Sequence, residues 1–355
     1  HVCDFTVTMG WKTHYVGIEK LVVDDVIVYL VDNEDFFNGD TLYRGGDAEI
    51  EQYAYFSRAI LEAIPLLDFK PEILHCNDWQ TGIIPFLVKT QYMFRPQGAL
   101  KTLVTIHNMA FQGVTGFGFL SNLLGIDSKY MNDGCLEFYD AANMMKAGLF
   151  YADKVNTVSP TYAKELCTPQ FGAKLEGVIN CITYKLSGII NGLDYKVFNP
   201  WTDPTIPFHY TAGRLAGKAK CKKALCEKMG LDISADTPII AMVTRMTDQK
   251  GFDLIAYVLE EMLSLDAIQI VVLGKLFALP LRQGQKFQRL GCAQIAKRLG
   301  ISRSSNSLTS SRARFSSRMV GAVFLSHSTH SCAFAFAALS ALSALCSSVR
   351  ASFGS

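Results

Sequence analysis

Acidic side chains are missing from the last quarter of this 355-residue chain. The last acidic residue is Asp266, and positions 267–355 hold 89 residues with 11 Lys or Arg but no Asp or Glu. Roughly ten acids would be expected in a segment of that length, because about a quarter of residues in globular proteins are charged. The formal net charge of +2 therefore hides a body, residues 1–266, with 23 basic and 32 acidic side chains. We expect the globular composition of the chain to end at about Gly274, with a segment of different composition after it.

Paired cysteines, metal-binding clusters and membrane-length apolar runs are also missing. The ten cysteines form no Cys-x-x-Cys pair, which argues against the common zinc sites and favours reduced thiols in an intracellular protein. The apolar run Ala333–Ala344 is interrupted by serine and is shorter than the roughly 20 residues that span a bilayer. The Arg- and Ser-rich stretch Ser302–Arg318 has one aromatic residue, Phe315. We therefore expect no metal, no membrane and no nucleic-acid partner.

Short β-rich runs alternate with helical patterns along residues 26–273. The patterns predict strands at 26–32, 72–76, 102–106, 154–157, 187–190, 238–243 and 268–273. They predict helices at 47–67, 82–92, 217–229 and 252–263. This alternation favours a doubly wound α/β fold with largely parallel sheets.

Polar residues follow several of the predicted strands. The tips are Asn77-Asp78, His107-Asn108, Asn191-Gly192 and Arg245. Ligands bind at the carboxyl ends of strands in open α/β sheets. Four polar tips of this kind indicate a lined cleft.

The segment Val243–Asp253 carries the most specific of these signals. Arg245 follows the predicted strand, and Lys250 with Gly251 precedes the predicted helix. A helix N-terminus favours anions through its free N–H groups and its dipole. Arg offers a planar fork to phosphate oxygens, Lys offers a mobile point charge, and Gly allows close backbone approach. The segment predicts a clamp for a diphosphate.

Several segments in fixed order resemble the bacterial glycogen synthase and plant starch synthase family. Besides the Arg245 and Lys250 motif, they are Ile73–Gly82, Val104–Gly113, Met145–Asp153, Thr157–Glu165, Gly172–Gly177 and Ile189–Asp194. The resemblance covers roughly residues 20–274. It implies a GT-B fold, in which two Rossmann-like domains face a cleft, with the second domain incomplete here. The expected domains are 1–191 on the glucan-acceptor side, a partial nucleotide-sugar domain at 192–274, and a non-native or disordered tail at 275–355.

The resemblance also implies an activity. Such enzymes transfer glucose, with retention, from ADP-glucose or UDP-glucose to the non-reducing end of an α-1,4-glucan. No metal or other cofactor is implied, because protein cations stabilise the departing diphosphate. The compartment would be the plastid stroma for a plant-type enzyme and otherwise the cytoplasm.

Residue roles follow from the same resemblance. Arg245 and Lys250 would neutralise charge on the leaving diphosphate, beside Gly251. His107 would position the donor glucose, and Asn191 would lie at the donor site.

The remaining predicted site residues lie in the first domain. Asn108 and Gln112 would contact ligands in the cleft. Asp78 would contact the sugar or acceptor, or alternatively cap the following helix. Trp79 would offer a flat face for glucan stacking.

Two family motifs are not found. Lys12-Thr13 lacks the glycines of a Lys-x-Gly-Gly-Leu loop, and no Glu after Glu261 can supply a Glu-x-x-Cys-Gly motif. We expect a fragment whose tail was translated in a wrong frame or through an intron. The motifs identify the family without establishing that this chain is active. Two alternatives stay open: a glucan- or nucleotide-binding pseudoenzyme, and another retaining glucosyltransferase such as a sucrose or trehalose-phosphate synthase.

Overall fold

The computed structural model describes residues 1–38, 43–229, 231, 233, 236–244, 248–265, 268–273 and 321–323. The chain divides into two compact units, one of His1–Gly192 with Phe315–Ser355 and one of Leu193–Arg314. Of the predicted tail at 275–355, only strand β13 (Gly321–Val323) falls within the described residues. Within the described ranges, no helix is both long and apolar enough to cross a bilayer.

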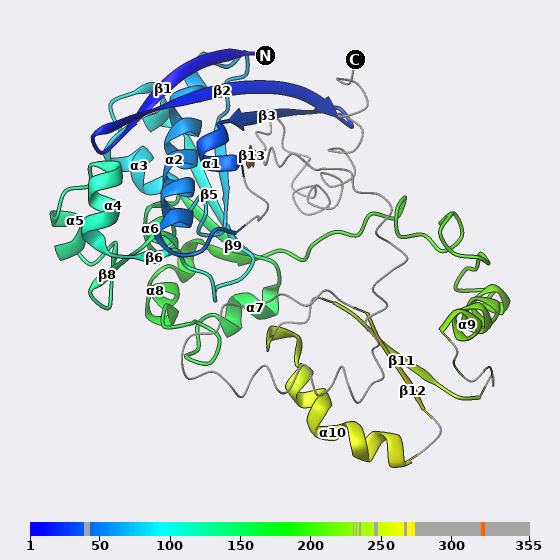
Figure 1. The fold of residues 1–355 in the computed structure, drawn as a ribbon. Helices are drawn as coiled ribbons and strands as arrows, with labels where there is room; N and C mark the ends of the chain where they lie inside the picture. Colours follow the sequence, from blue (N-terminus) through cyan, green and yellow to red (C-terminus); the bar gives the residue numbers. More distant parts are fainter. Residues whose placement is uncertain are drawn as a thin grey trace. The chain divides into compact units, whose positions relative to one another are not determined.

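The first unit combines a parallel sheet, an antiparallel sheet and a small three-stranded sheet (Figure 1). Its strands are β1 (Cys3–Met9), β2 (Lys12–Val23), β3 (Val26–Asp32), β4 (Ile73–Asn77), β5 (Lys101–Ile106), β6 (Val114–Thr115), β7 (Glu137–Phe138), β8 (Ala141–Asn143), β9 (Lys154–Thr157), β10 (Leu186–Gly188) and β13. Its helices are α1 (Glu34–Phe37), α2 (Gly46–Ala63), α3 (Ile84–Thr90), α4 (Phe117–Leu124), α5 (Lys129–Asn132), α6 (Met144–Tyr151), α7 (Pro160–Glu165) and α8 (Glu176–Cys181), with short 3₁₀ turns η1 (Ile64–Leu66), η2 (Pro96–Ala99) and η3 (Thr183–Lys185).

The parallel sheet has the strand order β10-β9-β5-β4. Asn77 pairs with Thr105, and Ile106 pairs with Thr157, so the carboxyl ends of three strands meet at one edge. Helices α3 and α6 pack together, and α7 packs against β9 and β10. The predicted parallel strands of this region are thereby confirmed to within two residues at each end.

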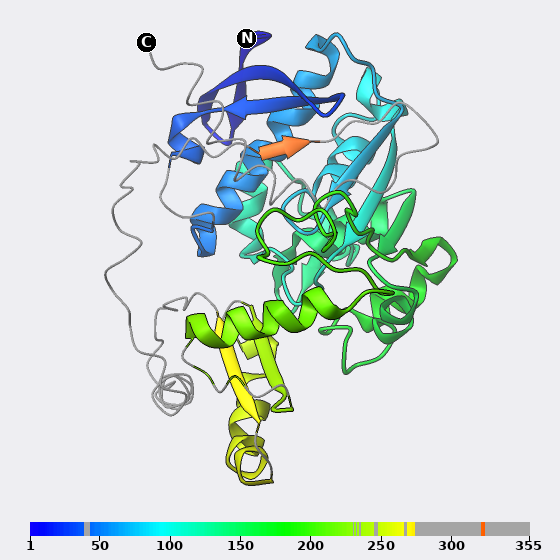
Figure 2. The ribbon, with the colours of Figure 1, turned by 90° about the vertical axis from the view of Figure 1, so that its right-hand side faces the viewer.

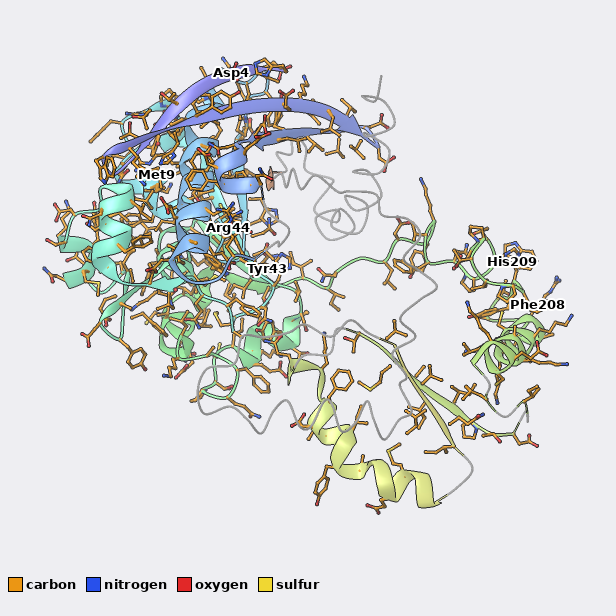
Figure 3. The ribbon with its side chains drawn as sticks, viewed as in Figure 1. Asp4, Met9, Tyr43, Arg44, Phe208 and His209 are labelled. Atoms are coloured by element: carbon orange, nitrogen blue, oxygen red, sulfur yellow. The ribbon has the colours of Figure 1, made fainter. Side chains whose placement is uncertain are left out.

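The antiparallel sheet, β1-β2-β3-β13, was not predicted apart from β3. Along β1, the exposed Asp4 and the buried Met9 (Figure 3) belong to an alternating pattern of burial. The turns of its hairpins use Gly10 at φ +60° and Asp24-Asp25 at φ +47° and +65°. An Asp-Asp pair is an uncommon sequence for a turn that needs two positive φ angles, so the turn signal was weak. Figure 2 shows β13, in orange, beside β3, its antiparallel partner.

Helix α2 joins the layers of the first unit. It packs against β1 and β3 and against α3 and α4. Ile50, Ala54 and Leu61 lie on one helical face and are at most 4% exposed, as expected for residues spaced by three or four positions. The Glu49 carboxylate accepts a 2.8 Å hydrogen bond from the Gly45 N–H at the helix start. The helix therefore buries one face in the core, and the Glu49 carboxylate in its first turn stabilises its N-terminus.

The second unit contains a strand–helix–strand motif. It consists of β11 (Ile239–Val243), the 3₁₀ turn η4 (Asp248–Lys250), α10 (Phe252–Leu265) and β12 (Gln269–Leu273). The two strands pair in parallel from Ile239 with Gln269 to Val243 with Leu273. The predicted strand, turn and helix around Lys250 are confirmed.

The basic helix α9 (Ala216–Met229) belongs to the same unit. Phe208 and His209 precede it (Figure 3), and Lys220 Nζ lies 5.6 Å from the centre of the Phe208 ring. A Cβ on Gly217 would lie 2.0 Å from the His209 carbonyl oxygen. The chain thus folds back tightly onto the first turn of α9.

Two glycines let helix α6 approach the turn that precedes α3. A Cβ on Gly148 would lie 2.4 Å from the carbonyl oxygen of Gly82, and a Cβ on Gly82 would lie 2.8 Å from the carbonyl oxygen of Met144. Both obstacles are backbone atoms, which cannot rotate away as a side chain can. The turn that carries Asp78 is therefore seated directly on α6.

We expect Gly148→Ala to destabilise the chain by about 2 kcal/mol. Alanine normally stabilises a helix interior by ~1 kcal/mol over glycine, but overpacking against backbone costs ~3 kcal/mol. Thermal unfolding measures the net sign. Gly177→Ala is the matched control, because Gly177 lies in α8 and a Cβ there would meet no atom of the described residues within 4 Å. A stabilised Gly148→Ala variant would contradict the close approach.

Candidate functional site

The parallel sheet brings two of the predicted polar tips together. Asp78 directly follows β4, and His107 directly follows β5. The backbone N–H groups of His107 and Asn108 donate to Asp78 Oδ1 at 2.8 and 3.3 Å. The Asp78 N–H in turn donates to the Thr105 carbonyl at 3.0 Å. The two strand ends are therefore tied to each other through one carboxylate.

Asp78 holds an unusual backbone conformation, with φ at +53°. Asp is one of the few non-glycine residues that adopts this region readily. Burial raises the pKa of the Asp78 carboxyl, while the N–H donors and nearby His107 oppose that rise. Its bonds go to the His107 segment and not to α3, whose N-cap is Ile83 without a side-chain bond. The alternative that Asp78 caps the following helix is therefore wrong.

The imidazole of His107 is half-buried, and a hydrogen bond with Asn77 orients it. Its Nε2 lies 2.9 Å from Asn77 Oδ1, which as an amide oxygen can only accept. Burial lowers the pKa of His107, and the nearby Asp78 carboxylate only partly opposes this. The ring is thus an uncharged, oriented hydrogen-bonding group at neutral pH. Such a group is suited to positioning a sugar and is not suited to supplying a permanent charge.

A second histidine lies beneath this edge. His75 Nε2 lies 2.6 Å from Thr105 Oγ1, which also bonds to Asn156, so β4, β5 and β9 share a polar ladder. Burial lowers the pKa of His75, and the neighbouring His107 lowers it further. No role was predicted for His75 from the sequence, because it forms no metal-ligand constellation with the other histidines.

The depressed pKa of His75 predicts acid sensitivity. A histidine whose folded-state pKa lies below its unfolded value of about 6.5 contributes stability above that value and loses it as the pH falls. His75→Gln keeps a hydrogen-bonding side chain but does not titrate. We expect thermal stability to fall less between pH 7 and 5 in this variant than in the wild type, by up to ~1.4 kcal/mol per pH unit. Parallel pH profiles would contradict the prediction. The raised pKa of Asp78 changes stability with pH in the opposite direction. Asp78 is present in both the wild type and His75→Gln, so its contribution cancels in the difference between their pH profiles.

Trp79 does not present the flat exposed face that we predicted. Its side chain is 6% exposed and makes an edge-to-face contact with Tyr53 at 5.3 Å between ring centres. A Cβ on Gly113 would lie 2.3 Å from the indole ring, and Gly113 has φ at +63°. The indole therefore packs beneath the His107 loop, and its burial, driven by its large apolar area, was not visible in the sequence.

Asn108 and Gln112 lie on the loop after β5. Asn108 is half-buried, and its Oδ1 accepts from the Ala110 N–H at 3.0 Å. Gln112 is 8% exposed, with its amide bonded to three protein partners described below. Asn191 is exposed and lies three residues after the end of β10. Their roles toward a ligand stay predictions.

In the second unit, Lys250 is exposed at the end of η4, two residues before α10 begins. Gly251 has φ at +67°, and among the described residues a Cβ there would come within 4 Å of Leu254 Cδ1 alone, at 3.7 Å. This positive φ favours glycine at the position. Arg245 lies outside the described residues, so the structure gives the position of Lys250 alone.

Two residues that support α6 were not predicted from the sequence. Asn143 caps its N-terminus by accepting from the Lys146 N–H at 2.9 Å. Lys185 is 6% exposed and donates to the carbonyls of Phe150 and Ala152 at 2.8 and 2.6 Å, at the helix C-terminus. Burial lowers the pKa of Lys185. The described residues contain no group of three or more His, Cys, Asp or Glu that could hold a metal.

Comparison with known proteins connects this geometry to a family. The family model of the starch synthase catalytic domain matches residues 1–181. Glycogen synthase of Clostridium acetobutylicum is 43% identical over 276 residues, covering 77% of this chain and 57% of the relative. Glycogen synthase of Streptococcus equi subsp. equi is 45% identical over 271 residues, covering 76% and 56%. The chain thus spans a little over half the length of these relatives.

A solved structure agrees with the sequence comparisons. The catalytic domain of starch synthase IV from Arabidopsis thaliana, bound to ADP and acarbose, matches with a TM-score of 0.74 and 28% identity, over 84% of this chain and 60% of that chain. The predicted α/β fold of GT-B type and the predicted family resemblance are both confirmed. The chain belongs to the starch synthase catalytic domain family, which includes the bacterial glycogen synthases.

Proposed function

We propose that this protein is a hexosyltransferase that moves glucose from ADP-glucose or UDP-glucose to the non-reducing end of an α-1,4-glucan with retention. The observation that carries the proposal is the place of Lys250, in the turn between a parallel strand and the N-terminus of α10. A cation and a helix N-terminus together suit a diphosphate. The ADP and acarbose bound to the Arabidopsis relative give the same two ligand classes.

Each unit has its own part in the proposed reaction. Lys250, with Arg245, would neutralise the charge that develops on the departing diphosphate, and stabilisation of that charge lowers the barrier. His107 would hold a sugar hydroxyl through a neutral imidazole oriented by Asn77. Asp78 would fix the backbone beneath it. This arrangement assigns the charge stabilisation to protein cations, with no metal or cofactor.

We also propose an intracellular setting, the plastid stroma for a plant-type enzyme. All seven cysteines among the described residues are free thiols, which fits a reducing compartment.

A transfer assay on the full chain tests the proposed function. ADP-glucose and UDP-glucose are offered separately with maltoheptaose, fructose or glucose phosphate, and the products are analysed by NMR. We expect a maltoheptaose chain one glucose longer through an α-1,4 bond. Maltoheptaose binding without transfer would favour a glucan-binding pseudoenzyme. Transfer to fructose or glucose phosphate would favour another retaining glucosyltransferase.

A further inference from the structure

Gln112 lies where three segments of the first unit meet. Its Nε2 donates to the carbonyl of Met109 at 3.0 Å, in its own loop, and to the carbonyl of Ala173 at 2.9 Å, 61 residues further along the chain. Its Oε1 accepts from Asn143 Nδ2 at 2.6 Å, at the start of α6. One side chain thereby links the His107 loop, the loop 168–175 and helix α6.

The orientation of this amide is fixed by backbone groups. The Lys146 N–H can only donate, so the Asn143 atom that it meets must be Oδ1. Asn143 Nδ2 therefore faces Gln112, and the Gln112 atom that accepts its hydrogen bond must be Oε1. Gln112 Nε2 is left facing two carbonyl oxygens, which can only accept. Each donor in the chain therefore meets an acceptor, and both Nε2 hydrogens are used within the protein.

The loop reached by Gln112 carries backbone strain. Ala173 and Lys174 have φ at +50° and +68°, a region that costs alanine and lysine roughly 1–2 kcal/mol each. Such conformations persist only where the surroundings hold them. The exposed Lys174 places its Nζ 5.0 Å from the ring centre of Tyr139, which is 70% exposed and belongs to the β7–β8 hairpin. The bond from Gln112 to Ala173 thus holds the residue next to an exposed cation–aromatic pair.

We propose that Gln112 is a positioning residue that fixes the loop 168–175 against the His107 loop, so that Lys174 and Tyr139 are held ready for a glucan chain. This replaces the role of a direct ligand contact, since the side chain is 8% exposed and its donors are occupied. The glucan part rests on the proposed function. The loop-holding part does not.

Three variants and one control test this role in the full chain. Gln112→Ala removes all three bonds, and Gln112→Glu puts a carboxylate against the two carbonyls. Asn143→Asp keeps the cap on α6 but loses the donor to Gln112, so it serves if the Gln112 variants fail to fold. Gln97→Ala is the matched control, because Gln97 is also buried, at 2% exposed, and its Nε2 bonds to the Leu61 carbonyl in the core.

Hydrogen exchange of the loop is the first readout. We expect amide exchange in 172–175 to accelerate about tenfold in the Gln112 variants, as for the loss of a buried hydrogen bond, and less in Asn143→Asp. Gln97→Ala should leave exchange in these residues unchanged, even if it lowers thermal stability. Equal exchange of the loop in Gln112→Ala, Gln112→Glu and Gln97→Ala would overturn the positioning role.

Substrate kinetics or binding give the second readout. We expect the KM for maltoheptaose, or its Kd where no transfer occurs, to rise about tenfold, with the KM for the nucleotide sugar unchanged. Faster exchange with an unchanged maltoheptaose KM or Kd would overturn the glucan part. A wild-type chain that neither transfers glucose nor binds maltoheptaose would overturn the proposed function and the glucan part, while loop exchange would still decide the role of Gln112.

Discussion

Replacing Lys250 with alanine is expected to lower kcat/KM for glucose transfer on the order of 100- to 1,000-fold, the usual loss when one preorganised donor to a developing negative charge is removed. Lys250 lies at the turn into α10, where its charge adds to that of the helix N-terminus. The affinity for ADP should fall as well, by about tenfold or more, because a charged hydrogen bond is worth ~1.5–3 kcal/mol. Transfer kinetics and calorimetric titration with ADP measure the two losses separately.

The control for Lys250→Ala is Lys223→Ala. Lys223 is an exposed lysine of the same unit, on α9, so its removal changes the net charge equally. It should leave both transfer and ADP binding within a factor of about two, as expected for a screened surface charge. Equal losses in the two variants would show that Lys250 contributes only to the general field. Lys250→Arg keeps the charge and should recover part of the ADP affinity.

Replacing Asp78 with alanine is expected to destabilise the first unit by about 3 kcal/mol. Two backbone N–H groups, of His107 and Asn108, lose their acceptor, at a cost of ~1–3 kcal/mol each. Alanine at φ +53° costs a further ~1–2 kcal/mol. Removing a buried carboxylate, whose pKa burial raises, offsets part of this loss. Thermal unfolding measures the total, and amide exchange at positions 107 and 108 measures the local opening.

Two other replacements separate the causes. Asp78→Asn keeps an acceptor oxygen and tolerates the positive φ, so it should cost least. Asp78→Gly keeps the backbone conformation without strain but loses the acceptor, so it should lie between asparagine and alanine. If glycine were as well tolerated as asparagine, the hydrogen bonds would have little energetic importance. If glycine were as harmful as alanine, the strain of the backbone conformation would have little energetic importance.

The sequence predicted the parallel strands and the turn around Lys250 well, because their signals are local. Buried parallel strands read as short apolar runs, and polar or glycine-containing tips mark where they end. The hairpin of β1 and β2 was missed for a local reason too. Its turn uses Gly10-Trp11, and the next turn, between β2 and β3, uses Asp24-Asp25; both are weaker signals than Asn-Gly or Asp-Gly.

The tips themselves were predicted as one set of ligand contacts, and the structure divides them. Asn77 and Asp78 bond mainly to the neighbouring strand end, so they support His107 rather than extend from the edge. Trp79 and Gln112 were both predicted to touch ligands, but both are buried through contacts with residues distant along the chain. Trp79 packs against Gly113, and Gln112 bonds to Ala173. Periodicity and spacing do not report such contacts.

The sequence by itself determined the family, the α/β architecture of residues 26–273 and the positions of the polar strand tips. These follow from residue type and spacing along one stretch of chain. Only the tertiary structure decided that Asp78 holds the His107 backbone, that Trp79 lies in the core and that Gln112 links two loops. The physical reason is that burial and hydrogen-bond pairing depend on which distant backbone groups come within about 3 Å.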